Sequence, residues 1–252
     1  MPSPLTTCLA FDTATEHLSI ALQVGDCVWS HEAAGGSLAS STLIPGVMDL
    51  LAQAGIGLRD LDAIAFGRGP GAFTGLRTAC SVAQGLAFGA DKPVLPIDTL
   101  LTVAEDARRL SDGETIGDVW VTMDARMDEI YAAHAVFEAG AWRLVTAPWL
   151  CTLQQLNERW RVAEPRAVAG TALIAFGDRL ACGAALRLPQ ALPRARAMLP
   201  LAAALWAHGG AVDAAQALPL YLRDKVAQTM AERAAAKALA ASAAVEVPEV
   251  LR

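Results

Sequence analysis

Apolar runs alternate with short polar stretches along the chain, and their lengths predict strands and helices in a defined order. The first run, Cys8 to Phe11, predicts a buried strand that ends at Asp12. The strands expected after it are 18–24, 27–31, 63–66, 94–97, 118–123, 129–137, 142–146 and 167–170. The expected helices are 42–54, which Gly55 ends, and 76–90, 100–110, 152–160, 171–180 and 199–208.

The order of these elements predicts the fold. Three strands come first, and helices then alternate with strands up to a third helix, as in a ribonuclease-H-like or actin-like unit, an α/β fold whose mixed sheet is covered by helices. A strand and turn with an Asp occur at Asp12 and again at Asp124, which predicts two lobes. The expected divisions are 1–110 for the first lobe, 111–197 for an abbreviated second lobe, 198–226 for a helix and extended segment that return to the first lobe, and 227–252 for an Ala-rich tail that is expected to fray.

A stretch rich in glycine connects a predicted strand to the predicted helix 76–90. Glycine backbones take positive φ angles and approach other groups closely, and free amides at a helix start suit an anion. An anion site and a tight connection without a ligand both remain open here. The stretch is not a Walker A loop, and Thr74 is expected to cap the helix. Its residues of interest are Gly67, Arg68, Gly69, Pro70, Gly71, Phe73, Thr74, Gly75 and Arg77.

The two Asp-bearing turns are the best candidates for chemistry. In a two-lobed actin-like phosphotransferase, an Asp at each turn would hold Mg²⁺ through water while turn amides bind the phosphates. The alternative, which we favour, is that each Asp caps its own turn. Only one glycine, Gly170, stands where a purine would pack, so a nucleotide site would be eroded. The candidate cleft residues are Asp12, Thr13, Thr15, Asp124, Arg126 and Gly170.

The predicted helix 42–54 has more apolar surface than one contact with a sheet requires. Its two adjacent stripes are Leu43, Val47, Leu50 and Ala54, and Ile44, Met48 and Leu51. Together they span about 160° of the helix. The surplus could lie under another element of this chain or against a partner, and the small residues of the next helix allow close approach. We expect the residues buried by a partner to include Leu43, Val47, Leu50 and Val82.

Composition narrows the function classes. A net charge of -6 argues against a dedicated nucleic-acid binder, and 54% hydrophobic residues argue against disorder. The four histidines are scattered and the five cysteines include no C-x-x-C pair, so neither a metal site nor a cofactor is expected. The start of the chain does not resemble a signal peptide and no apolar run is long enough to span a bilayer, so we expect a cytoplasmic protein with reduced thiols.

Four motifs together resemble one family. They are Phe11 to Thr15, Phe66 to Arg77 with its continuation through Ala87, Asp124 to Met127, and Pro219 to Arg223. In order and spacing, over about residues 8–230, the chain resembles the TsaB (YeaZ) family of bacterial tRNA threonylcarbamoyladenosine biosynthesis proteins. The Gly-rich segment is the most specific of the matching pieces.

The resemblance implies an actin-like ATPase fold without independent catalysis. Such proteins pair with TsaD, a metal-containing subunit that transfers threonylcarbamoyl to the adenosine next to the anticodon of tRNAs reading ANN codons, and a small ATPase, TsaE, joins them. The helix pair 42–54 and 74–90 would pack against TsaD or against a second copy in a homodimer. The chain would contact tRNA only as part of the complex. A histidine common in the family is Ala39 here.

Two other functions stay open from the sequence. The first is an ATP-dependent phosphotransferase of the actin-like class, against which the single Gly170 speaks. The second is a glycoprotease-like peptidase, but the chain has no H-x-x-x-H metal pair and no G-x-S-x-G elbow. The resemblance instead implies a scaffold subunit of the tRNA threonylcarbamoyl transferase without catalytic residues of its own, and this is the function that we expect.

Overall fold

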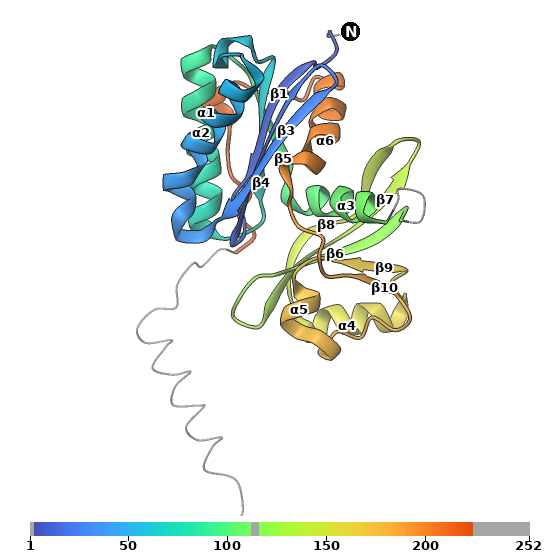
Figure 1. Cartoon of the computed structure of the whole chain (residues 1–252). Coiled ribbons are helices and arrows are strands. Elements are labelled where there is room, and N and C mark those ends of the chain that lie inside the picture. Colours follow the sequence, from blue (N-terminus) through green and yellow to red (C-terminus); the bar gives the residue numbers. More distant parts are fainter. Residues whose placement is uncertain (1–2, 112–115, 224–252) are drawn as a thin grey trace, which may run out of the picture. The chain divides into compact units, whose positions relative to one another are not determined.

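The residues described by the computed structural model, 3–111 and 116–223, form two five-stranded mixed sheets (Figure 1). The first has the order β3-β2-β1-β4-β5. Its strands are β1 (Thr7–Asp12), β2 (His17–Val24), β3 (Cys27–Ala34), β4 (Ala63–Gly69) and β5 (Val94–Asp98). The meander β1 to β3 is antiparallel, whereas β4 and β5 run parallel to β1. This is the ribonuclease-H-like arrangement that the sequence predicts.

The second sheet repeats the same plan with the order β10-β9-β6-β7-β8. Its strands are β6 (Asp118–Asp124), β7 (Glu129–Glu138), β8 (Ala141–Thr152), β9 (Ala167–Ala169) and β10 (Leu186–Leu188). Strands β6 to β8 are an antiparallel meander, and β9 and β10 add in parallel to β6. The predicted actin-like fold with two lobes is thereby confirmed. The short β10 was not predicted, because Leu186 and Arg187 are exposed and give no apolar run.

Helices cover both faces of each sheet (Figure 1). They are α1 (Ala39–Ala54), α2 (Phe73–Ala90), α3 (Thr99–Leu110), α4 (Leu153–Val162), α5 (Ala172–Phe176) and α6 (Ala195–Ala207). On the first sheet, α1 and α2 pack on one face and α6 on the other. On the second sheet, α3 packs on one face and α4 with α5 on the other. Helix α3 thus follows the last strand of the first sheet but contributes its apolar side chains to the core of the second.

Several element boundaries differ from those predicted. Helix α1 ends at Gly55 as expected, with φ of 69°, but starts three residues earlier than predicted. Helix α5 ends at Phe176 and a 3₁₀ turn follows, because Gly177, with φ of 52°, interrupts the helix. Helix α6 starts at Ala195, whose amide donates to the Ser19 hydroxyl (2.8 Å) and so has a partner outside the helix. The Ala-rich tail, 227–252, lies outside the described residues.

All five cysteines are free thiols, and four of them are buried. Burial raises the pKa of Cys8 to about 12, which makes it an inert core residue. In the part of the chain that the structure describes, no helix combines the length and apolar character needed to cross a bilayer.

Candidate functional site

The carboxylate of Asp12, at the end of β1, is fully buried and accepts hydrogen bonds on both oxygens. Oδ1 accepts one from the amide of Ala14 (2.7 Å), and Oδ2 accepts one from the hydroxyl of Thr99 (2.9 Å). A Cβ on Gly67 would lie 1.8 Å from Oδ2, so only glycine fits beside this carboxylate. Asp12 therefore holds its own turn and the start of α3 in place, and the chain itself encloses it.

This enclosure changes the acidity of Asp12. Burial raises its pKa from 3.8 to about 6, because the carboxylate loses its contact with water, and the hydrogen bonds from Ala14 and Thr99 offset only part of that effect. Ionised Asp12 is thus a source of instability near neutral pH.

A cation bound at Asp12 would need further ligands nearby. Among residues 3–111 and 116–223, no three His, Cys, Asp or Glu side chains lie close enough together to hold a metal ion.

Asp124 closes the equivalent turn of the second lobe, and its carboxylate also bonds within that turn. Oδ1 accepts a hydrogen bond from the amide of Arg126 (2.8 Å), and Oδ2 lies 3.7 Å from Nη1 of the same residue. Arg126, Met127 and Asp128 have φ angles of 61°, 57° and 60°, in the left-handed region that residues other than glycine rarely adopt. The amide of Asp124 donates to the hydroxyl of Thr171 (3.1 Å). Both Asp side chains make the local bonds of turn caps.

The other predicted cleft residues also bond within the chain. Arg126 Nη2 lies 3.2 Å from Oε1 of Glu16, which joins the turns of the two lobes. The hydroxyl of Thr13 donates to the carbonyl of Gly75 (2.7 Å), and that of Thr15 accepts from the amide of His17 (3.1 Å). The groups assigned to phosphate binding from the sequence therefore have partners without it.

Gly170 follows β9 and packs against the backbone of β6. Its φ is 108°, and a Cβ at this position would lie 2.4 Å from the carbonyl oxygen of Thr122. Both facts require glycine. The close packing of the two strands accounts for Gly170 without a purine.

The Gly-rich loop between β4 and α2 packs against the Asp-bearing turn of the first lobe. A Cβ on Gly71 would lie 2.5 Å from the carbonyl oxygen of Ala14, and one on Gly75 would lie 1.9 Å from that of Thr13. The amide of Ala72, just before the helix, donates to the same Ala14 carbonyl (2.7 Å). Of the two interpretations of the loop, these contacts favour the tight connection.

The expected start of α2 is wrong. The helix begins at Phe73 and not at Leu76, and its N-cap residue is Ala72, without a side-chain capping bond. Thr74 lies inside the helix, where its carbonyl accepts a hydrogen bond from the hydroxyl of Thr78 (3.0 Å). The hydrogen bond from the Ala72 amide to the Ala14 carbonyl holds the backbone in place just before Phe73, where the helix begins. A capping bond from Thr74 is therefore not needed.

Known proteins resemble this chain over most of its length. A family model described as TsaD, tRNA N6-adenosine threonylcarbamoyltransferase, matches residues 37–247. A tRNA threonylcarbamoyladenosine biosynthesis protein TsaB from Haemophilus influenzae is 36% identical over 87% of this chain and 94% of its own length. The TsaB protein of Escherichia coli is 38% identical over 87% of this chain and 95% of its own. The chain belongs to the TsaB (YeaZ) family.

A solved structure agrees with this assignment. YeaZ from Pseudomonas aeruginosa superimposes with a TM-score of 0.79 at 39% sequence identity, and the match covers 86% of this chain and all of that one. The resemblance drawn from the four sequence motifs is confirmed.

The TsaB-family helix pair presents a different face from the one predicted. Leu43, Val47 and Leu50 are 0%, 0% and 3% exposed, because they pack onto the first sheet in the chain's own core. They are not available to a partner, and the expectation that they contact one is wrong for all three. Val82 of α2 is partly buried against the same core. The spacing of the apolar residues in α1 predicted how wide its apolar surface is, but it could not show which of the two stripes faces the sheet.

Of the second stripe of α1, Ile44 and Met48 are 45% and 49% exposed, whereas Leu51 is 2% exposed and packs in the core. On the neighbouring α2, Gly85 and Gly89 are exposed and a Cβ on either would meet open space. The exposed side of the helix pair thus carries apolar side chains on α1, and on α2 it carries the two glycines together with Phe88, which is 85% exposed.

The sequence alone did not show which residues contact the C-terminal segment that contains Leu220 and Tyr221. The amide of Leu220 donates to the carbonyl of Arg68 in the Gly-rich loop (2.7 Å). The Tyr221 ring lies 5.0 Å from that of Phe73, and the guanidinium of Arg77 lies 3.7 Å above the Phe73 ring. These contacts hold the segment at the start of α2. The Leu220–Arg68 and Tyr221–Phe73 contacts join residues 152 and 148 positions apart, so they leave no local signal in the sequence.

Proposed function

We propose that this chain is a non-catalytic scaffold subunit in tRNA threonylcarbamoyladenosine biosynthesis. It works in the cytoplasm with a TsaD-type catalytic subunit and a TsaE-type ATPase, which act on the adenosine next to the anticodon of tRNAs reading ANN codons. The relatives from Haemophilus influenzae and Escherichia coli are tRNA threonylcarbamoyladenosine biosynthesis proteins, which supports a role in this pathway. The enclosure of Asp12 by Gly67 and Thr99 carries the proposal, because that carboxylate is closed to a substrate.

The outward face of α1 and α2 is the proposed partner surface. Ile44 and Met48 supply exposed apolar area, and such area on the surface of a protein marks an interface. Gly85 and Gly89 allow the backbone of another helix to approach closely. The partner is the TsaD-type subunit in the complex or a second copy of this chain when the chain is alone.

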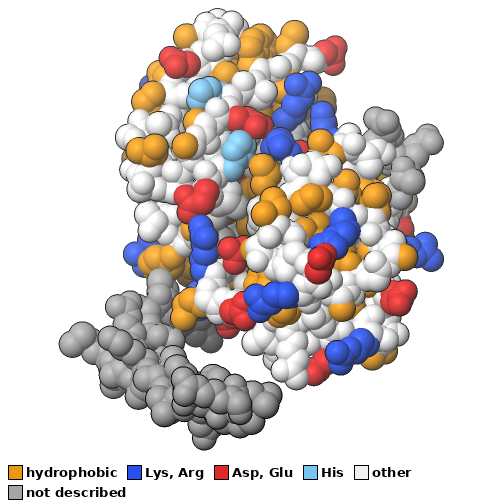
Figure 2. All heavy atoms as spheres, turned by 60° about the horizontal axis from the view of Figure 1, so that its bottom comes forward, with side chains coloured by type: hydrophobic (Ala, Val, Ile, Leu, Met, Phe, Trp, Pro, Cys, Tyr) orange, Lys and Arg blue, Asp and Glu red, His pale blue; other side chains and the backbone are white. Residues whose placement is uncertain are grey.

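Contact with tRNA is proposed to occur only through the complex. The chain carries a net charge of -6, and acidic side chains are interspersed among the basic ones over the face drawn in Figure 2. Most non-specific affinity for nucleic acid comes from basic side chains that neutralise phosphates. A surface with a net negative charge can neutralise few phosphates of a bound tRNA. The isolated chain should therefore bind tRNA weakly in a gel-shift assay, and salt-sensitive submicromolar binding would contradict the proposal.

Charging the helix face tests the scaffold function. The double variant Ile44→Glu, Met48→Glu should keep its circular dichroism spectrum, since both side chains are about half exposed, but should not co-elute with the TsaD-type subunit. Val162→Glu is the control, because Val162 on α4 is 90% exposed and lies in the other lobe. Co-elution of the double variant at the unmodified level would place the interface elsewhere.

The phosphotransferase alternative makes an opposite prediction for the isolated chain. It requires hydrolysis of Mg-ATP at an enzymatic rate and loss of that rate in Asp12→Asn. We expect no such hydrolysis by the purified chain, because both oxygens of Asp12 are occupied by Ala14 and Thr99. The peptidase alternative gains no support from the cleft residues.

A further inference from the structure

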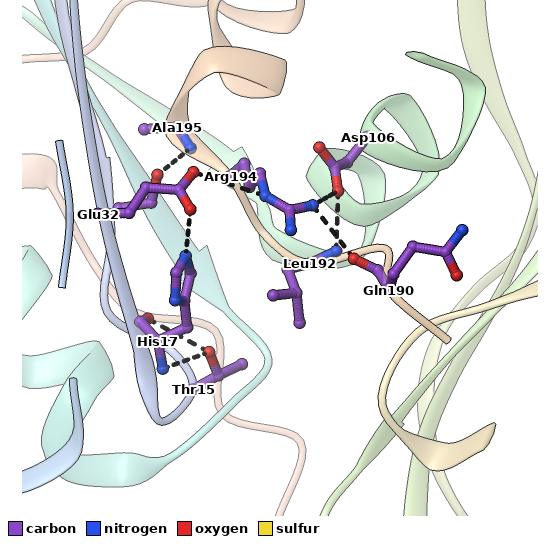
Figure 3. A network of polar contacts seen from close by, with 9 residues as sticks. Thr15, His17, Glu32, Asp106, Gln190, Leu192, Arg194 and Ala195 are labelled. Carbon is purple, nitrogen blue, oxygen red and sulfur yellow. Dashed lines mark hydrogen bonds and ion pairs between the residues drawn. The ribbon is translucent and has the colours of Figure 1, made fainter. Parts of the chain in front are cut away.

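Arg194, the residue before α6, bonds to elements of both lobes (Figure 3). Its Nη1 donates to Oδ2 of Asp106 on α3 and to the carbonyl of Gln190 (3.1 Å). Its Nε lies 3.5 Å from Oε1 of Glu32 on β3. One guanidinium thus connects a helix in the core of the second lobe to a strand of the first sheet.

The two arms of this connection differ in burial. The Asp106 side chain is only 7% exposed, and its Oδ2 also accepts a hydrogen bond from the amide of Leu192 (2.9 Å). The Glu32 side chain is 40% exposed, and its Oε2 lies 3.1 Å from Nε2 of His17. Breaking the bond to Asp106 would leave a buried carboxylate without its cation, which is strongly unfavourable, whereas the Glu32 arm is open to water.

A second link lies one residue along the same turn. Glu16, next to His17, meets Arg126 from the turn of the second lobe at 3.2 Å. Both of those side chains are mostly exposed, so this pair is the weaker link. Besides the hydrogen bond from Thr99 at the start of α3 to Asp12, the turn after β1 and the end of β3 are therefore tied to the second lobe by two ion pairs, of which that of Arg194 is the stronger.

We propose that Arg194 is a latch that fixes the orientation of the two lobes. Two-lobed proteins that close around a ligand do so by hinge motion, for which the lobes must be free to rotate. In this chain, rotation would pull Arg194 away from Asp106 or from Glu32. The latch keeps the lobes in one arrangement, so the chain behaves as a rigid body. This inference does not depend on the proposed function.

Distances between spin labels on the two lobes test the latch. Labels at Gln53→Cys on α1 and Arg161→Cys on α4, in a Cys27→Ser background, use two exposed positions and remove the one exposed native thiol. Pulsed electron paramagnetic resonance on this doubly labelled protein should give a single narrow distribution of label-to-label distances. Arg194→Met should broaden it about twofold by releasing the hinge. Arg196→Met, an exposed arginine of α6, is the matched control and should leave the width unchanged.

A broad distribution in the unmodified background, or an unchanged width in Arg194→Met, would overturn the latch. If circular dichroism shows that Arg194→Met does not fold, Glu32→Ala replaces it. That variant removes only the exposed arm and leaves the bond to Asp106, so it should fold and give a smaller broadening. No broadening in Glu32→Ala would then count against the proposal.

Discussion

The two Asp-bearing turns come from the same strand-and-turn pattern, yet they have different surroundings. Asp12 has no exposed surface and lies under the Gly-rich loop, whereas the side chain of Asp124 is 24% exposed. The first turn is held by backbone packing against glycines, and the second by local bonds to Arg126 in a left-handed backbone. A repeated motif therefore does not give a repeated environment, because the elements packed on each turn decide how far its carboxylate meets water.

The largest expected effect is in the packing of the first turn. Gly75→Val would place a Cβ 1.9 Å from the carbonyl oxygen of Thr13, which the backbone cannot accommodate without moving. We expect a loss of about 4 kcal/mol of stability or more, seen in thermal unfolding and soluble yield. Gly85→Ala, in the same helix but with open space around it, should be neutral or stabilising. Equal melting temperatures for both variants would show that the loop is not closely packed.

The next effect concerns the pH dependence of the first turn. The pKa of folded Asp12 is raised to about 6 from 3.8, so its contribution to stability is full below pH 3.8 and is lost as the pH rises through 6. Relative to Asp12→Asn, the unmodified chain should lose about 3 kcal/mol between low pH and pH 7. Denaturant unfolding of both proteins across this range measures the difference. A constant difference at all pH values would mean that the carboxylate is not desolvated.

A smaller effect is expected at the second turn. Asp124→Ala removes the acceptor for the Arg126 amide, a turn cap worth about 1 kcal/mol. Because Asp124 is partly exposed, water replaces part of the lost bond. Thermal unfolding of Asp124→Ala and Asp12→Ala, measured at a pH below the raised pKa of Asp12 where its buried carboxyl is uncharged, should show the larger loss for Asp12→Ala. The reverse order would break the contrast between the two turns.

The smallest effect is expected for the exposed link between the turns. Arg126→Met removes the ion pair between Arg126 and Glu16, which are 69% and 75% exposed, together with the longer 3.7 Å contact to Asp124. Such pairs contribute up to about 1 kcal/mol and weaken with salt. The change in melting temperature should be small at low salt and vanish at high salt, and a salt-independent loss would indicate a packing role for Arg126.

The order of strands and helices was predictable because apolar runs and punctuating residues such as Gly55 are local signals. The family was predictable from its motifs. The side of α1 that meets the sheet was not, because Leu43 and Ile44 are adjacent in sequence and equally apolar, and only packing decides between them. Nor was the enclosure of Asp12, which depends on Gly67 and Thr99, residues 55 and 87 positions away.

We propose that this chain acts through the outward face of α1 and α2 and not through the cleft between its two Asp-bearing turns. The most direct test is the rate of tRNA threonylcarbamoyladenosine formation by the reconstituted complex containing Asp12→Asn or the Ile44→Glu, Met48→Glu double variant. We expect a rate within about twofold of the unmodified complex for Asp12→Asn, and loss of both assembly and product formation for the double variant. A rate at least about tenfold lower for a fully assembled Asp12→Asn complex would contradict it.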